Sequence, residues 1–277
     1  MSVTETSRVG FIGLGSQGGP MAQRIIDAGF DVTLWARREQ SLAPYMNSSA
    51  HVADTPEALA ERCNIVCVCV VDDAGVNELC TRLLPFMSAG SLLVIHSTIH
   101  PTTCKTLAQQ AEQYGVALID APVSGGGPAA ENGTLTVMVG GSSADVARVK
   151  PVFDSFAGLI SHLGDIGAGQ AAKLINNNLM AANLALAHAA TELGTSLELS
   201  RAELLTLIAN SSGRSFALDV YARMPSPGAF AHGAALLKKD IRLLGELAGS
   251  DNNHYQQLGN TGGVFIDAVE HDGSNSQ

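Results

Sequence analysis

Apolar, β-branched runs alternate with helix-length stretches over the first 163 residues, and this alternation restricts the fold more than any other feature. Strand, helix and strand at this spacing require parallel strands, with helices covering both faces of the sheet. We therefore predict an α/β fold with a doubly wound, mainly parallel sheet. The predicted strands are Val9–Ile12, Val32–Trp35, Ile65–Val71, Leu92–His96, Ala117–Ile119, Thr134–Val139 and Leu159–Leu163, and the predicted helices include Met21–Ala28, Thr55–Arg62, Asn77–Met87 and Thr102–Tyr114.

Helical patterns alone follow from Gly167 onward. Gln170–Gly194 is a run of about 25 residues with no proline and no internal glycine, long enough for a helix of roughly 37 Å. Shorter helical stretches follow at Arg201–Asn210, Ser215–Arg223 and Ala234–Ala248. We therefore predict two domains, an α/β domain over residues 1–166 and an all-helical domain over residues 167–277.

Composition excludes several classes of function. The chain of 277 residues has a formal net charge of -10, which argues against a nucleic-acid binder, because that role needs clustered Lys and Arg. No run of apolar residues is long enough to span a membrane, and the short polar amino end does not resemble a signal segment. With 46% apolar and 15% charged residues, we expect a soluble cytoplasmic protein that buries surface against copies of itself.

The cysteines indicate a reducing compartment. The five cysteines are an odd number, and no Cys or His pair stands at metal-binding spacing from Cys67 and Cys69. We expect buried free thiols and no metal site.

A glycine pattern connects the first predicted strand to the first helix. In a G-x-G-x-x-G motif, the first glycine makes the tight turn, the second lets the backbone approach a pyrophosphate, and the third lets helix and strand pack closely. The amino end of the helix then offers N–H groups to the phosphates. The motif predicts a dinucleotide site, the alternative being a glycine-rich turn without ligand. Its residues are Gly13, Leu14, Gly15, Ser16, Gln17 and Gly18.

Two arginines follow the second predicted strand. An acid at this strand end would bind the ribose 2′-hydroxyl of NAD, whereas an arginine would bind the 2′-phosphate of NADP. Here Arg37 and Arg38 follow Ala36, Asp31 lies at the start of the strand, and Glu39 lies beyond the arginines. Guanidinium groups make paired hydrogen bonds to phosphate. NADP is favoured and NAD remains possible, the alternative being solvated surface arginines.

Two further segments carry polar groups suited to chemistry. Ser124, Gly125 and Gly126 belong to a glycine-rich segment after a strand, which predicts either a loop with amides that face an anion or a plain turn. On the long helix, Gln170, Lys173 and Asn177 share one face. A lysine side chain on a mostly apolar helix forms an ion pair, is exposed to solvent, or has a role in binding or catalysis. This face is therefore either a solvated polar stripe or part of a site.

Together these motifs resemble the β-hydroxyacid dehydrogenase family, which includes 3-hydroxyisobutyrate dehydrogenase and the glyoxylate/succinic semialdehyde and tartronate semialdehyde reductases. The resemblance covers nearly the whole chain. It depends on Phe11-Ile12-Gly13-Leu14-Gly15, Asp120 to Gly126 with Gly133-Thr134-Leu135, Gly167-x-Gly169-x-x-x-Lys173-x-x-x-Asn177, Lys239-Asp240, and Ser97-Thr98 before Pro101.

The resemblance implies a role for each matching residue. Ser124, Gly125 and Gly126 would hold the substrate carboxylate, Lys173 would be the general acid/base, and Asn177 would orient Lys173 or the substrate. The resemblance also implies a Rossmann-type domain followed by an all-helical domain that forms homodimers or homotetramers. Lys239 would lie close to the cofactor and the active site, and Ser97 or Thr98 would lie close to the nicotinamide ribose.

The predicted function is hydride transfer between NADP(H) and a small β-hydroxy acid or its semialdehyde. A lysine ammonium with the usual pKa near 10.4 is a competent proton donor at neutral pH, which favours the reductive direction. The alternatives are an NADPH-dependent imine reductase and a catalytically idle dinucleotide-binding module. One departure from the family pattern is that residues 251–277 contain no obvious version of the final family helix.

Overall fold

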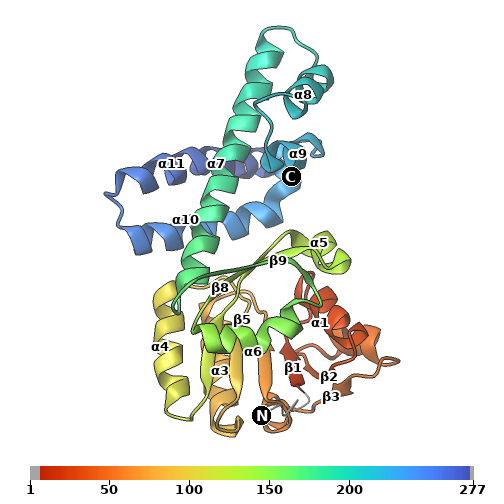
Figure 1. Ribbon diagram of the computed structural model, residues 1–277. Helices are drawn as coiled ribbons and strands as arrows, with labels where there is room; N and C mark the ends of the chain where they lie inside the picture. The colour runs from red at the N-terminus through yellow and green to blue at the C-terminus, as the bar shows by residue number, and fades with distance from the viewer. Residues whose placement is uncertain (1–6, 275–277) are drawn as a thin grey trace. The chain divides into compact units, whose positions relative to one another are not determined.

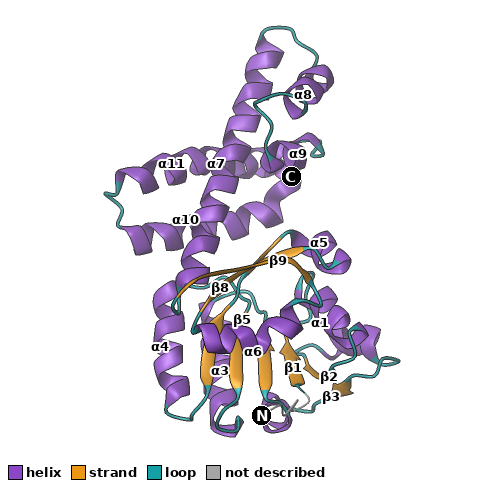
Figure 2. Cartoon of the chain, viewed as in Figure 1, coloured by secondary structure: helices purple, strands orange, loops and turns teal. Residues whose placement is uncertain are grey.

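The computed structural model describes residues 7–274, which form two compact units (Figure 1). The first unit ends at Lys173 and the second begins at Leu174, so the boundary falls within one long helix. The strands, orange in Figure 2, belong to the first unit, and the second contains helices and loops.

The first unit is built on one sheet. From β3 to β6 neighbouring strands are parallel, whereas β8 is antiparallel to β6 and β7 and parallel to β9. This confirms the predicted doubly wound, mainly parallel α/β fold. Among the described residues the sheet has nine strands in the order β3-β2-β1-β4-β5-β6-β8-β7, with β9 also paired to β8. They are β1 (Arg8–Ile12), β2 (Asp31–Trp35), β3 (His51–Val52), β4 (Ile65–Val68), β5 (Leu92–Ile95), β6 (Ala117–Asp120), β7 (Val123–Ser124), β8 (Leu135–Gly140) and β9 (Ala157–Gly164).

Helices cover both faces of this sheet. Successive side chains of a strand point to opposite faces, so a strand buried on both sides is a continuous apolar run. In β5, Val94 packs in the core that contains residues of α1 and α6, and Leu93 packs in the core with residues of α2, α3 and α4. The helices are α1 (Gly18–Asp27), α2 (Pro56–Arg62), α3 (Asp73–Leu83), α4 (Pro101–Glu112), α5 (Gly126–Asn132) and α6 (Ser143–Phe153), with 3₁₀ turns η1 (Glu39–Tyr45) and η2 (Leu84–Phe86).

Side-chain caps set where several of these helices begin. Thr55, Asp72 and Ser142 each stand before a helix and accept a hydrogen bond from the N–H three residues later. Such a cap satisfies one of the N–H groups that the first helical turn leaves without a partner.

The long helix α7 (Ala168–Ser196) leads into the second unit. The apolar core of the second unit includes Leu184, Tyr221 and Phe265, which come from three different helices. His188 lies against the same rings and shares a hydrogen bond of 3.0 Å with the Tyr221 hydroxyl. The other elements are α8 (Arg201–Ala209), α9 (Phe216–Ala222), η3 (Pro227–Phe230), α10 (Ala231–Ala248) and α11 (Asn253–Ser274).

The sequence-based expectation for the carboxyl end is wrong, because residues 253–274 form the 22-residue helix α11. Glycines at 259, 262 and 263 lower the helix propensity of this segment. Tertiary packing compensates: Phe265 and Ile266 are buried. A Cβ on Gly262 would lie 2.8 Å from the Ala181 Cβ, so this glycine permits close packing of α11 on α7.

Three further features concern the described residues only. Within residues 7–274 no helix is long and apolar enough to cross a membrane, and no group of three or more His, Cys, Asp or Glu side chains is placed to hold a metal ion. The cysteines are free thiols, as predicted; Cys69 is partly exposed and the other four are buried. Burial raises the pKa of Cys63 to about 11 and that of Cys80 to about 12, so these thiols stay neutral.

Candidate cofactor and active site

The glycines of the fingerprint differ in the space around them. Gly13 has φ +103°, and a Cβ there would lie 2.0 Å from the Cys69 carbonyl oxygen. A Cβ on Gly18 would lie 2.0 Å from the Gly13 carbonyl oxygen, so these two glycines let strand, turn and helix pack against each other. A Cβ on Gly15 would meet no described atom within 4 Å beyond its two chain neighbours. The backbone is thus open at Gly15, where the motif requires a pyrophosphate to approach.

A cleft of about 510 Å³ opens beside this turn. Its walls come from the carboxyl ends of β1 and β2 and from the segment between β4 and α3. The order β3-β2-β1-β4 reverses direction at β1, which is where doubly wound sheets bind ligands. Of the predicted cofactor residues, the cleft is lined by Gly13, Leu14, Gly15, Arg37 and Arg38. These residues fit the adenosine and pyrophosphate part of a dinucleotide.

The remaining fingerprint residues, Ser16, Gln17 and Gly18, form the turn into α1. Gln17 is the N-cap residue of α1, and its carbonyl oxygen accepts a hydrogen bond from the Met21 N–H. The amino end of α1 therefore begins at Gly18, three residues after the open backbone at Gly15.

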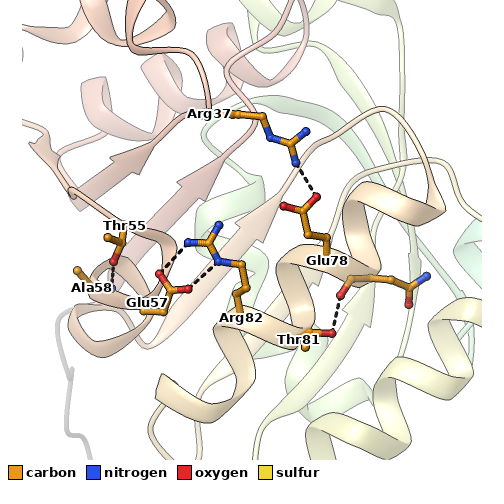
Figure 3. A network of polar contacts seen from close by, with 8 residues as sticks. Arg37, Thr55, Glu57, Ala58, Glu78, Thr81 and Arg82 are labelled. Atoms are coloured by element: carbon orange, nitrogen blue, oxygen red, sulfur yellow. Dashed lines mark hydrogen bonds and ion pairs between the residues drawn. The ribbon is translucent and has the colours of Figure 1, made fainter.

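A carboxylate from α3 lies beside Arg37, two residues after the end of β2. Glu78, from α3, lies 2.8 Å from the Arg37 guanidinium, and Figure 3 shows the two side chains pointing toward each other. The same figure shows Arg82 bound by both oxygens of Glu57, and the Arg82 guanidinium lies 5.8 Å from the centre of the Trp35 ring. No carboxylate ends β2 in the sequence itself, but folding brings Glu78 of α3 to Arg37.

Ser97 supports the wall of the cleft. Its buried hydroxyl accepts a hydrogen bond of 2.8 Å from the N–H of Val70, a cleft residue. The predicted end of this strand at Val71 is wrong: β4 ends at Val68, and beyond it the Val70 N–H is bonded to a side chain. Thr98 follows as a half-buried residue.

Two buried polar side chains hold the first turn of α7 against the sheet. Asp120 is fully buried, and its two oxygens accept hydrogen bonds from the N–H groups of Gly167 at 2.6 Å and Gln170 at 2.8 Å. The Gln170 amide donates to the Ser97 carbonyl at 2.7 Å and accepts from the Ile99 N–H at 3.1 Å. Burial raises the pKa of the Asp120 carboxyl, and these N–H groups act in the opposite direction. No local pattern assigns this role to Asp120, because its partners lie 47 and 50 residues away.

Lys173 follows Gln170 by one helical turn and is only 8% exposed. A lysine at this position is therefore neither a solvated surface residue nor part of an exposed polar stripe.

The segment Ser124–Gly126 joins β7 to α5. Ser124 ends β7 and pairs with Thr136 of β8, and α5 begins at Gly126. Gly125 has φ +131°, and Gly126 has φ +74°, backbone conformations that glycine adopts without strain. A Cβ on Gly127 would lie 3.0 Å from the Ser16 carbonyl oxygen, so the segment lies directly beside the dinucleotide turn. The local geometry is a strand-to-helix turn, since the helix-forming Ala129-Ala130 sequence follows at once.

In the helical unit, Asn177 and Lys239 meet at one carboxylate. The Asn177 amide donates to Asp240 at 2.5 Å, and the Lys239 ammonium lies 3.6 Å from the other Asp240 oxygen. Asp240 is 2% exposed, and its backbone carbonyl accepts a hydrogen bond from Asn178. In the sequence, the only signal for Asp240 is its place in the Lys239-Asp240 pair, which assigns it no role.

Two family models together match almost the entire chain. Residues 8–164 match the NAD binding domain of 6-phosphogluconate dehydrogenase, and residues 167–276 match the NAD-binding family of NADP-dependent 3-hydroxyisobutyrate dehydrogenase. The chain belongs to the 3-hydroxyisobutyrate dehydrogenase-like β-hydroxyacid dehydrogenase family. The family consists of NAD(P)-dependent oxidoreductases, and the resemblance drawn from the motifs is confirmed.

The chain is also similar to individual proteins of known sequence or structure. An uncharacterised oxidoreductase of Mycobacterium tuberculosis is 39% identical over 68% of this chain, and the match spans only 65% of that relative. The 2-(hydroxymethyl)glutarate dehydrogenase of Eubacterium barkeri is 34% identical over 89% of this chain and 83% of its own length. The solved structure of 3-hydroxyisobutyrate dehydrogenase from Mycobacterium tuberculosis with L-serine has a TM-score of 0.84, with 26% identity, and covers 96% of this chain and 99% of that one.

Proposed function

We propose that this β-hydroxyacid dehydrogenase-like chain transfers a hydride between NADP(H) and a small β-hydroxy acid or its semialdehyde. One observation carries the proposal. Lys173 is buried one turn beyond Gln170, whose amide is hydrogen-bonded to the backbone of Ser97 and Ile99 at the end of β5. The proton-carrying group is thereby tied to the strand end proposed to contact the nicotinamide ribose.

The cleft beside Gly15 would hold the dinucleotide, which supplies the hydride when bound. Open backbone at Gly15 and the amino end of α1 would bind the pyrophosphate. Arg37 and Arg38 line the same cleft and would bind a 2′-phosphate, which favours NADP over NAD. Ser97 and Thr98 would contact the ribose next to the nicotinamide.

The substrate would bind through its carboxylate at Ser124, Gly125 and Gly126, next to the dinucleotide turn. In the reductive direction Lys173 would donate a proton to the aldehyde oxygen while the carbonyl carbon accepts the hydride, which gives the alcohol. In the oxidative direction the neutral amine would take the hydroxyl proton.

Asn177 and Lys239 are the remaining proposed site residues. Both are held by the buried Asp240 carboxylate, which fixes their side chains in the helical unit. In this proposal Asn177 orients Lys173 or the substrate, and Lys239 lies near the cofactor.

We also propose that the helical unit forms a homodimer or homotetramer. It exposes large apolar side chains that are costly to leave in water. The described large apolar side chains of this unit that are more than half exposed are Ile175, Leu186, Leu193, Leu197, Leu199, Leu207, Phe216 and Val264.

A substrate panel with Lys173 variants tests the reaction. Short aldehyde acids and cyclic imines are assayed with NADPH and NADH separately, using wild type and Lys173→Met. Loss of the proton donor should lower turnover of an aldehyde acid by about 10²–10⁴-fold while NADPH affinity stays near normal. Lys150→Met, at an exposed lysine of α6, is the control. Full activity of Lys173→Met, or turnover of imines alone, contradicts the proposal.

A further inference from the structure

The Arg37–Glu78 ion pair gives the two arginines of the cofactor cleft different charge environments. Arg37 is paired with Glu78 at 2.8 Å, and both side chains are about half to two-thirds exposed, at 68% and 53%. Arg38 lines the same cleft and makes no ion pair with any residue in the described range 7–274. The free protein therefore offers a 2′-phosphate one neutralised guanidinium and one available guanidinium.

A 2′-phosphate brings nearly two negative charges to this position. To bind both terminal nitrogens of the Arg37 guanidinium, the phosphate must displace Glu78 from Nη2 or share that nitrogen with it. The Glu78 carboxylate also repels the phosphate directly, because both would lie within a few ångströms of the same guanidinium. NADH has only a hydroxyl there, so it meets neither cost.

We propose that Glu78 is a specificity-determining residue that weakens NADPH binding relative to NADH by competing with the 2′-phosphate for Arg37. The inference rests on the proposed role of Arg37 and Arg38 in 2′-phosphate binding, and it adds a residue from α3 to the cofactor site. Glu78 keeps the enzyme less selective for NADPH than its two arginines alone would make it.

Glu78→Gln tests the inference, since it removes the charge and keeps the side-chain length. The dissociation constants of NADPH and NADH are measured from nicotinamide fluorescence, at salt concentrations of about 25 mM and about 300 mM. Loss of one exposed ionic competitor should lower the Kd of NADPH by about 3- to 10-fold at low salt and that of NADH by less than about 2-fold. At high salt the gain for NADPH should shrink, because exposed charges are screened.

Asp154→Asn is the matched control. Asp154 pairs with Lys150 in an exposed ion pair of the same unit, with side chains 57% and 51% exposed, and it does not line the cleft. The variant removes the same charge from the protein as Glu78→Gln does, so it reports any effect of net charge alone. We expect it to leave the ratio of the two dissociation constants at the wild-type value.

One result would overturn the inference: an unchanged ratio of the two dissociation constants in Glu78→Gln. The ratio stays unchanged if neither cofactor gains affinity, or if both gain equally through the pyrophosphate charge that they share. A third variant separates this failure from failure of the NADP proposal. Arg37→Ala with Arg38→Ala should raise the Kd of NADPH far more than that of NADH, whatever Glu78 does. Equal effects of that double variant on both cofactors would refute 2′-phosphate binding itself.

Discussion

The contact between Asp120 and the first turn of α7 permits a quantitative prediction. Asp120→Ala leaves the N–H groups of Gly167 and Gln170 buried without an acceptor, and each such group costs about 1–3 kcal/mol. The two costs sum to about 2–6 kcal/mol. Burial raises the pKa of Asp120, so the ionised carboxylate itself carries a penalty that its removal relieves. We therefore expect the free energy of unfolding to fall by about 3 kcal/mol.

Urea denaturation followed by tryptophan fluorescence measures this loss. Trp35 is the only tryptophan of the chain and ends β2, so its emission reports unfolding of the first unit. The midpoint should fall without a change in the slope of the transition. Asp120→Asn should show a smaller loss, because its amide oxygen still accepts one of the two hydrogen bonds while its NH₂ group faces the other N–H.

Ser142→Ala provides the comparison at an exposed cap. The Ser142 hydroxyl accepts from the Asp145 N–H at 3.1 Å at the start of α6, and its loss should cost about 1 kcal/mol. If Asp120→Ala costs no more than Ser142→Ala, then burial does not make the Asp120 hydrogen bonds more costly to lose than those of an exposed cap.

Three further predictions concern the core, the cofactor turn and the helical unit. Burial lowers the pKa of His96 to about 4 from 6.5, so stability should be complete above pH 6.5 and fall by about 3 kcal/mol as the pH falls toward 4. Urea midpoints across this range should show the loss in wild type and not in His96→Leu. Gly15→Ala should fold normally and bind NADPH at least about 10-fold more weakly. Gly18→Ala should lower the thermal midpoint, because the added Cβ would lie 2.0 Å from the Gly13 carbonyl oxygen. An unchanged thermal midpoint in Gly18→Ala would contradict the packing role of this glycine. Leu193→Ser with Leu197→Ser should reduce the oligomer measured by light scattering, and an unchanged mass would exclude this face as the contact.

The sequence predicted the cofactor turn and most of the sheet because those signals are local. Gly13, Gly15 and Gly18 act through the space at their own Cα atoms, and the strands of a doubly covered sheet are continuous apolar runs. The helix α11 escaped prediction because its glycines weaken a local signal that packing against Ala181 and the burial of Phe265 overcome. The end of β4 at Val68 also escaped prediction, and the Val70 N–H beyond it is bonded to Ser97, 27 residues away.

The amino-acid sequence by itself determined the α/β class, the dinucleotide turn, the pair of arginines after β2 and the lysine of the long helix, because periodicity and spacing record which residues share a strand, turn or helix face. Only the tertiary structure decided that Asp120 caps α7 and that Glu78 neutralises Arg37. Those partners lie 41 to 50 residues apart along the chain. Contacts at such separations depend on how strands and helices pack, and no local pattern encodes that packing.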